Sequence, residues 1–238
     1  MSALDDPRLV ARETADERGL TARTAAQEAT ATGPDPYAVA FEAVAESEPD
    51  LVLEVGCGHG ELAERIGREL DARVVALDQS ERMVELTRRR GVEAIVGDAQ
   101  DLPFRSGIFD CAVAAWMLYH VGDLQQALGE LRRVLRPDGR LVAATSSERN
   151  LAELWQLVGR TGAPADGFSA ENAEGALLRH FTIVERRDVR GTVTFADREA
   201  AHRHISACPV DRELAGRLPA FDRPLVVSRH AVVFVCEP

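Results

Sequence analysis

The segment Leu51–Gly60, LVLEVGCGHG, restricts the possible folds of this chain more than any other stretch. Its first five residues are apolar except for one glutamate, which is typical of a buried strand. Three glycines follow in alternation with other residues. After them, apolar residues recur at every fourth position from Leu62 to Leu70, the spacing of one helix face. A strand, a glycine loop and a helix in this order bring free backbone N–H groups close to a ligand, and such groups attract a carboxylate or a phosphate.

Strands and helices alternate regularly after this segment, which favours right-handed crossovers and a parallel sheet. Asp35, Ser80 and Asp123 are predicted N-caps of the helices, and Ser169 is the predicted cap of a helix in a less regular region, 147–180. Seven strands are expected in all. They are 51–55, 73–77, 92–96, 109–115, 140–145, 182–189 with a continuation after Gly191, and 228–236.

Charge and cysteine usage narrow the class of protein. The formal charge is −11, from 28 basic and 39 acidic residues, which opposes binding to nucleic acid or to an anionic membrane. The four cysteines form no CxxC pair and are expected to be reduced thiols. The first residues lack the apolar core of a signal peptide, and the longest mostly apolar run, Cys111–Val121, is too short to span a bilayer. We therefore expect a soluble, cytoplasmic protein.

The residues that directly follow the strands are the candidates for ligand binding, because open α/β sheets bind ligands beyond the carboxyl ends of their strands. Asp78 follows the second strand, 78 − 58 = 20 residues after the middle glycine, where a carboxylate can accept both hydroxyls of a ribose. Asp98 follows the third strand. Glu61 takes the place of the third glycine of a dinucleotide fingerprint. A carboxylate there disfavours a pyrophosphate and favours a phosphate-free ligand with an amino-acid moiety.

Five motifs in a fixed order extend this pattern over about residues 50–145: LEVGCGHGELA, VVALDQS, VGDAQDLPF, FDCAVAAWMLYHV and LRRVLRPDGRL. With them the chain resembles the class I S-adenosylmethionine-dependent methyltransferases, in particular the small-molecule enzymes of type 11. The resemblance implies a Rossmann-like, seven-stranded, mostly parallel sheet with helices on both faces and an antiparallel last strand. It also implies S-adenosylmethionine as the cofactor.

The same resemblance assigns cofactor contacts to residues at the ends of four strands. Asp78 would bind the ribose hydroxyls, with Gln79 against the adenine, and Asp98 would meet the adenine amine, with Ala99 beside it. The backbone at the end of the fourth strand, around Ala115 and Trp116, would complete the methionine pocket. The residues that would wrap the methionine part are Glu54, Gly56, Cys57, Gly58 and Gly60.

The chemistry requires little of the protein, because the methyl group of a sulfonium is already activated and positioning supplies much of the rate. A base is needed only if the acceptor must lose a proton. His120 is the candidate catalytic residue, since it follows the fourth strand and titrates near neutrality. Tyr119 is a weaker substitute. No His, Cys and carboxylate cluster has the spacing of metal ligands, so no metal is expected.

We interpret residues 1–238 as a single methyltransferase domain that acts on a small molecule at O, N or C, as a monomer or a homodimer, with no nucleic-acid or membrane partner. Its expected parts are an N-terminal helical lid or arm (1–48) with Tyr37 near the pocket, a cofactor-binding core (49–146), a substrate-side helical insertion (147–180), and the last two strands with a helical insert (181–238).

Two other functions share parts of this pattern. A nicotinamide-dependent oxidoreductase would share the first strand, the glycine loop and the acid after the second strand. A regulatory domain that binds the cofactor without catalysis would share the whole pocket. Methylation of nucleic acid is disfavoured, since AWMLYHV after the fourth strand lacks an Asn/Asp-Pro-Pro-aromatic motif.

Overall fold

The computed structural model describes residues 31–160, 167–208 and 211–238. One eight-stranded sheet forms its centre, with the order β1-β7-β8-β6-β5-β2-β3-β4. Neighbours from β6 to β4 are parallel, whereas β8 is antiparallel to both β6 and β7, so the predicted Rossmann-like sheet with an antiparallel last strand is confirmed. The strands are β1 (Ala31–Thr32), β2 (Leu51–Val55), β3 (Arg73–Asp78), β4 (Glu93–Val96), β5 (Phe109–Ala115), β6 (Leu135–Ser146), β7 (Ile183–Phe195) and β8 (Leu225–Glu237).

The expected number of seven strands is wrong, because β1 adds an eighth at the edge of β7. This strand has two residues and no apolar alternation, so no local pattern marks it. Contacts distant in sequence hold it: the Thr32 and Thr192 hydroxyls lie 2.7 Å apart, and the Arg229 guanidinium donates to the backbone carbonyls of Thr32 and Pro34. The N-terminal arm expected at 1–48 is described only from Ala31 onward; residues 1–30 lie outside the described residues.

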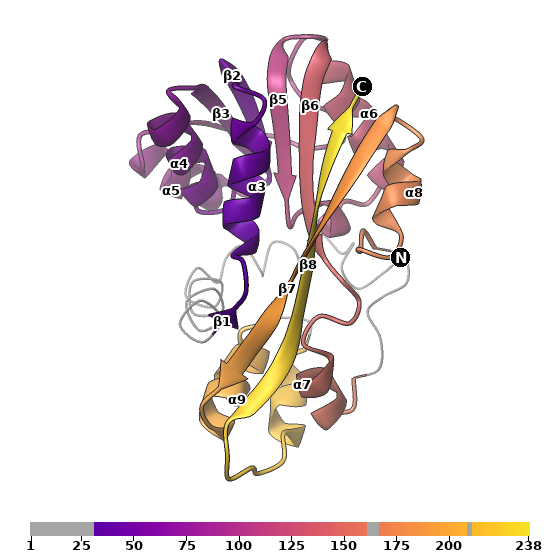
Figure 1. Ribbon diagram of the computed structural model, residues 1–238. Coiled ribbons are helices and arrows are strands. Elements are labelled where there is room, and N and C mark those ends of the chain that lie inside the picture. The colour runs from indigo at the N-terminus through magenta and orange to yellow at the C-terminus, as the bar shows by residue number, and fades with distance from the viewer. Residues whose placement is uncertain (1–30, 161–166, 209–210) are drawn as a thin grey trace.

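Helices cover both faces of the sheet, as predicted (Figure 1). One buried cluster joins one face to three helices, α3 (Pro36–Ala45), α4 (Glu61–Leu70) and α5 (Glu81–Arg89). Another joins the opposite face to α6 (Leu124–Val134) and α8 (Ala173–Leu177). The predicted cap at Ser169 is wrong: α8 begins after Asn172, without a side-chain cap.

The two longest strands, β7 and β8, extend past the end of β6 as a ribbon, and β1 pairs with the outer side of its β7 strand. β6 pairs with β8 only from Ala231 to Cys236, and residues 225–230 of β8 pair with β7 alone. Figure 1 shows this ribbon leaving the main sheet and carrying a small helical layer at its far end. The layer consists of α7 (Ala152–Leu157), α9 (Arg198–Ser206) and the 3₁₀ helix η3 (Arg212–Arg217), which share a separate apolar core with the ribbon.

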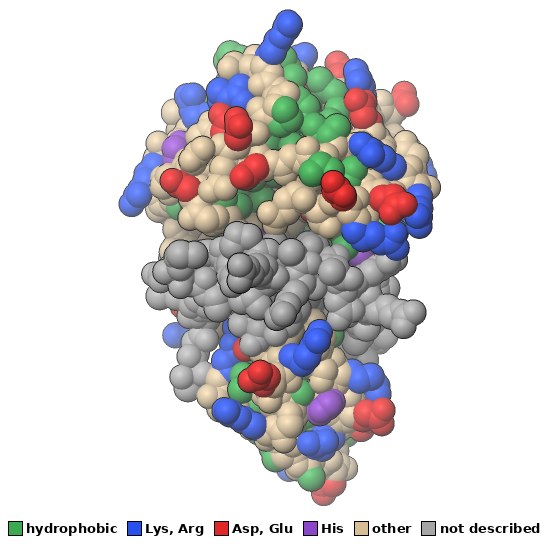
Figure 2. Space-filling view, turned by 180° about the vertical axis from the view of Figure 1, so that it is seen from behind, with side chains coloured by type: hydrophobic (Ala, Val, Ile, Leu, Met, Phe, Trp, Pro, Cys, Tyr) green, Lys and Arg blue, Asp and Glu red, His purple; other side chains and the backbone are tan. Residues whose placement is uncertain are grey.

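In the described ranges, no helix has the length and the apolar character that crossing a membrane requires. On the face drawn in Figure 2, acidic and basic side chains are interspersed over the described parts of the molecule.

Candidate functional site

The glycine loop between β2 and α4 has a backbone that glycine adopts far more readily than other residues. Gly56, Gly58 and Gly60 have φ angles of 70°, 51° and 75°. A Cβ atom at Gly56 would lie 2.6 Å from the Met117 side chain, and one at Gly60 would lie 2.6 Å from Thr87 Oγ1. At Gly58 it would meet nothing within 4 Å. Two glycines thus allow close packing, and Gly58 borders open space in which a ligand can approach the backbone.

Asp78 lies at the end of β3 and joins the glycine loop to the next helix. Its carboxylate accepts a hydrogen bond from the Gly58 N–H at 3.0 Å and another from the Ser80 N–H at 2.9 Å. The residue is 5% exposed, and burial raises its pKa while these two hydrogen bonds oppose the rise. A carboxylate offers about four acceptor sites. Asp78 therefore holds the loop and still has acceptor capacity for two hydroxyl groups, as binding of a ribose requires.

Two buried polar atoms beside the loop have no hydrogen-bond partner among the described residues, Glu54 Oε2 and His59 Nε2. Glu54 is 4% exposed, and its carboxyl group accepts a hydrogen bond from the backbone N–H of Ala63. Burial raises the pKa of Glu54 to about 8, and the nearby Asp78 charge adds to the rise. An unpaired buried carboxylate is costly, and a cationic group beside it would offset that cost. The Glu54 site thus fits the ammonium group of an amino-acid moiety.

The raised pKa of Glu54 predicts that, without ligand, the protein becomes less stable as pH rises. The folded state binds a proton that the unfolded state releases above its ordinary pKa of 4.5, so stability is lost as pH rises toward 8. We expect Glu54→Gln to unfold at a higher temperature than wild type at pH 8, with a gain on the order of 3 kcal/mol. At pH 4.5 the two proteins should differ little.

Thermal unfolding at both pH values checks this prediction, with Glu42→Gln on the exposed side of α3 as the matched control. The same substitution should weaken binding of S-adenosylhomocysteine, because the amide cannot pair with an ammonium. A Glu54→Gln protein less stable than wild type at pH 8 would contradict the assignment.

An arginine that the sequence motifs do not include braces the loop from outside. Arg90, directly after α5, donates to the His59 carbonyl at 2.7 Å and to the carboxylates of Glu64 at 2.6 Å and Glu61 at 3.1 Å. Glu61 is therefore paired, so its charge disfavours a pyrophosphate less than the sequence alone indicates. Cys57 also stabilises the loop: burial raises the pKa of its thiol, and Sγ lies 3.5 Å from Thr87 Oγ1.

The predicted adenine-side residues follow β3 and β4. Gln79 is exposed directly after Asp78. Asp98 is exposed, and its carboxylate accepts hydrogen bonds from the backbone and side chain of Gln100, whereas Ala99 is buried in the core. The Gly97 N–H donates to the Asp78 carbonyl at 3.0 Å. The structure therefore brings the ends of β3 and β4 together, with Asp78 and Asp98 on the same edge of the sheet.

The residues after β5 form the next part of this edge. Ala115 ends the strand, and Trp116 has a φ of 53°, a strained conformation that occurs often at functional sites. Its ring lies 4.3 Å from the ring of Tyr37, which is the second residue of α3 and is 42% exposed. The start of α3 thus lies against the end of β5. His120 ends the 3₁₀ helix η2 (Leu118–His120), with its ring 4.3 Å from that of Tyr119.

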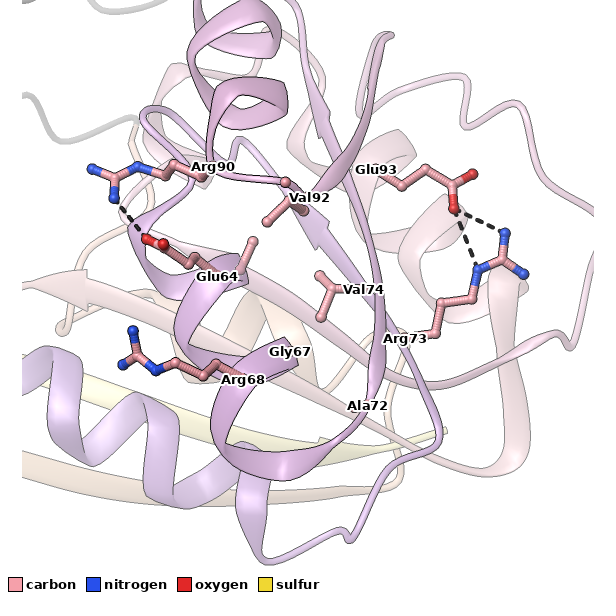
Figure 3. A pocket seen from close by; sticks show the side chains of 11 residues that line it. Glu64, Gly67, Arg68, Ala72, Arg73, Val74, Arg90, Val92 and Glu93 are labelled. Carbon is pink, nitrogen blue, oxygen red and sulfur yellow. Dashed lines mark hydrogen bonds and ion pairs between the residues drawn. The ribbon is translucent and has the colours of Figure 1, made fainter.

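A separate cavity of about 500 Å³ lies at the amino ends of β3 and β4 (Figure 3). Two ion pairs line it, Arg90 with Glu64 and Arg73 with Glu93, and the Arg73 and Glu93 side chains are mostly exposed. Ligands of open α/β sheets bind at the carboxyl ends of the strands. This cavity is therefore distinct from the candidate site.

In the parts of the chain that the structure describes, no three His, Cys, Asp or Glu side chains are grouped to hold a metal ion. The four cysteines are free thiols, and the two on β5 and β8 are buried.

Comparison with known proteins agrees with this geometry. Residues 53–143 match a family described as a methyltransferase domain. The chain is 33% identical over 159 residues to malonyl-[acyl-carrier protein] O-methyltransferase of Salmonella typhimurium, covering 65% of this chain and 62% of that protein. It is 36% identical over 104 residues to demethylmenaquinone methyltransferase of Thermotoga maritima, covering 42% and 45%. The chain thus spans less than two thirds of either relative.

Solved structures share the fold. The N-methyltransferase NodS from Bradyrhizobium japonicum, in complex with S-adenosylhomocysteine, superposes with a TM-score of 0.54 at 18% identity over 85% of each chain. At this identity the likeness describes the fold only.

Proposed function

We propose that this chain, whose residues 53–143 match a methyltransferase-domain family, transfers a methyl group from S-adenosylmethionine to a small organic molecule. The observation that supports this most is the edge formed by the glycine loop, Glu54 and Asp78. It combines an open glycine, a buried carboxyl group with one oxygen that lacks a hydrogen-bond partner among the described residues, and a second carboxylate with spare acceptor capacity. These three features suit a nucleoside that carries an amino-acid tail and no phosphate.

The bound cofactor would supply an activated methyl group on a sulfonium sulfur. In the proposal, Glu54 and the loop N–H groups hold the amino-acid end, and Asp78 and Asp98 hold the nucleoside end. Gly56, Cys57, Gly60, Gln79, Ala99, Ala115 and Trp116 complete the cofactor contacts. Fixing both ends of the cofactor orients its methyl group toward the acceptor side of the sheet, and this orientation supplies much of the rate. His120 is the base that the sequence predicts for an acceptor that must lose a proton.

Ligand-dependent stabilisation tests the cofactor assignment. At a concentration 100 times its dissociation constant, S-adenosylhomocysteine should raise the free energy of unfolding by about 2.7 kcal/mol. We expect a shift of several degrees in the melting temperature, and none with NADH at the same concentration. Stabilisation by NADH alone would favour an oxidoreductase instead.

Turnover separates an enzyme from a cofactor-binding regulatory domain. Labelled S-adenosylmethionine incubated with a metabolite extract should transfer label to small molecules. Cofactor binding without any transfer to that extract would favour the regulatory alternative.

The remaining features of the proposal concern partners, location and parts of the chain. We propose a cytoplasmic protein, monomeric or homodimeric, without a nucleic-acid partner. The interspersed charges of Figure 2 agree with the last point, since phosphate contacts need clustered Lys and Arg. The proposed parts are an arm (1–48), a cofactor core (49–146), a helical insertion on the acceptor side (147–180) and the last strands with their insert (181–238).

A further inference from the structure

A histidine on β8 forms a network with two charged residues of β7. His230 Nε2 lies 2.5 Å from Asp188 Oδ1. The Arg186 guanidinium donates to both oxygens of the same carboxylate, at 2.9 Å and 3.0 Å. Arg186 is itself fixed by a hydrogen bond to the Ala170 carbonyl at 2.6 Å. A second arginine of β7, Arg190, lies 3.7 Å from Asp188 Oδ1.

The network lies beside the carboxyl end of β6, close to the proposed cofactor site. The Ser147 N–H, directly after the carboxyl end of β6, donates to the His230 carbonyl, and the His230 N–H donates to Asn150 Oδ1. Only β6 separates β8 from β5, and neighbouring strands lie about 4.8 Å apart, so β8 runs on the order of 10 Å from the strand that precedes Trp116. Asp188 and His230 therefore belong to the same edge of the sheet as the candidate cofactor site.

The contacts of Asp188 determine which nitrogen of His230 carries a proton. The two hydrogen bonds from Arg186 keep Asp188 ionised, and they lower its pKa far below the ordinary value. An ionised carboxylate only accepts hydrogen bonds, so Nε2 of His230 carries the proton that it shares with Asp188. In the neutral imidazole, Nδ1 then has a free lone pair. The His230 side chain is 17% exposed. Its Nδ1 atom makes no hydrogen bond with the described residues. Since Nδ1 does not count among their buried unpartnered atoms, it is accessible to solvent.

From this geometry we infer that His230, oriented by Asp188 and Arg186, is the general base for a hydroxyl acceptor. The inference rests on the proposed methyl transfer. The acceptor oxygen forms a bond to the methyl carbon as the bond between that carbon and sulfur breaks, and the electron pair of the broken bond stays on sulfur. The hydroxyl proton moves to Nδ1 of His230. The imidazolium is stabilised by Asp188 and later releases the proton to solvent.

The presence of a base favours a hydroxyl over other acceptors. A neutral amine attacks through its lone pair and can lose its proton afterwards, and a carboxylate has no proton to lose. A weakly acidic hydroxyl gains nucleophilicity only as its proton leaves, and a positioned base contributes about 10²–10⁴-fold to such a step. Arg186 and Asp188 are positioning residues in this scheme, since they act through the imidazole.

The test uses labelled S-adenosylmethionine and two phenols of different acidity, 4-nitrophenol and 4-methoxyphenol, at pH 8. The first phenol is largely ionised there and needs no base, whereas the second keeps its proton. His230→Gln should slow methylation of 4-methoxyphenol about 100-fold and that of 4-nitrophenol only a few-fold. The rate ratio of the two phenols is measured on one protein sample, so a loss of folded protein cancels.

The matched control is His202→Gln on α9, which should leave the ratio at its wild-type value. Equal losses for both phenols with His230→Gln would indicate a structural role and overturn the inference. If His120→Gln, and not His230→Gln, slowed methylation of 4-methoxyphenol much more than that of 4-nitrophenol, His120 would be the base and the inference would be overturned. A wild type that binds S-adenosylhomocysteine and methylates neither phenol would also overturn the inference. Absence of S-adenosylhomocysteine binding would overturn the proposed function itself.

A nuclear magnetic resonance measurement tests the tautomer without any acceptor. With ring-¹⁵N histidine, and at a pH where the ring is neutral, the His230 signals should show a proton on Nε2 and none on Nδ1. Asp188→Asn should change this distribution. A proton on Nδ1 in wild type would contradict the scheme.

Discussion

Replacing Asp78 with alanine is expected to weaken binding of S-adenosylhomocysteine about 100-fold, because two hydrogen bonds to a charged group together contribute about 3 kcal/mol. The expected loss has two sources. The variant lacks the acceptor for the ribose hydroxyls, and the N–H groups of Gly58 and Ser80 lose their partner. Isothermal titration calorimetry measures the change directly.

The affinities of two further variants provide a comparison for Asp78→Ala. Asp78→Asn keeps one acceptor oxygen and should bind with intermediate affinity. Asp98→Ala removes an exposed carboxylate at the proposed adenine end and should cost about tenfold, the equivalent of one such hydrogen bond. If Asp78→Ala bound the ligand within a few-fold of wild type, the ribose contact would have to be assigned elsewhere.

Gly58 and Gly60 of the glycine loop should respond differently to a single added methyl group. At Gly58 a Cβ meets open space, so Gly58→Ala should lose only the backbone cost of its positive φ, about 1 kcal/mol of stability. The methyl group would project from the loop where the ligand must approach, and we expect affinity for S-adenosylhomocysteine to fall at least about 100-fold, as for other displaced close contacts. At Gly60 a Cβ would lie 2.6 Å from the buried Thr87 side chain. Gly60→Ala should therefore lose about 3 kcal/mol of stability.

Urea unfolding and calorimetric titration together separate these effects. Gly107→Ala is the matched control, since Gly107 also has a positive φ of 68° and open space at its Cβ, but lies before β5 and away from the loop. It should match Gly58→Ala in stability and match wild type in affinity. Unchanged ligand affinity in Gly58→Ala would show that the ligand does not approach this glycine.

Local signals in the sequence predicted the elements that build the cofactor side. Asp35, Ser80 and Asp123 each accept a hydrogen bond from an N–H two or three residues later, as their positions before helices predict. The predicted strand 109–115 matches β5, because neighbouring residues alone show where a buried apolar run begins and ends. The mostly parallel sheet follows from the same alternation, and its antiparallel last strand follows from the resemblance to a known family.

Features that depend on distant partners were not predicted. Arg90 binds the His59 carbonyl 31 residues away, and within the sequence it belongs to a run of arginines that usually complements a helix C-terminus. His230 meets Asp188 only because β8 pairs with β7 in one register, 42 residues apart. Ser169 does not cap α8, because its hydroxyl donates to the Glu148 carboxylate, 21 residues away, and accepts from the Glu171 N–H before α8 begins. Such contacts depend on tertiary packing, which periodicity does not encode.

The position of β8 sets an order of events during synthesis on the ribosome. It is the last strand along the described chain, yet it lies between β6 and β7. Strands β2 to β6 therefore emerge and can assemble first, with the free edge of β6 left unpaired until residues 225–237 have been made. Asp188 and His230 meet only after that step. A nascent chain thus completes the part of the site proposed to hold the cofactor before it completes the part proposed to act on an acceptor.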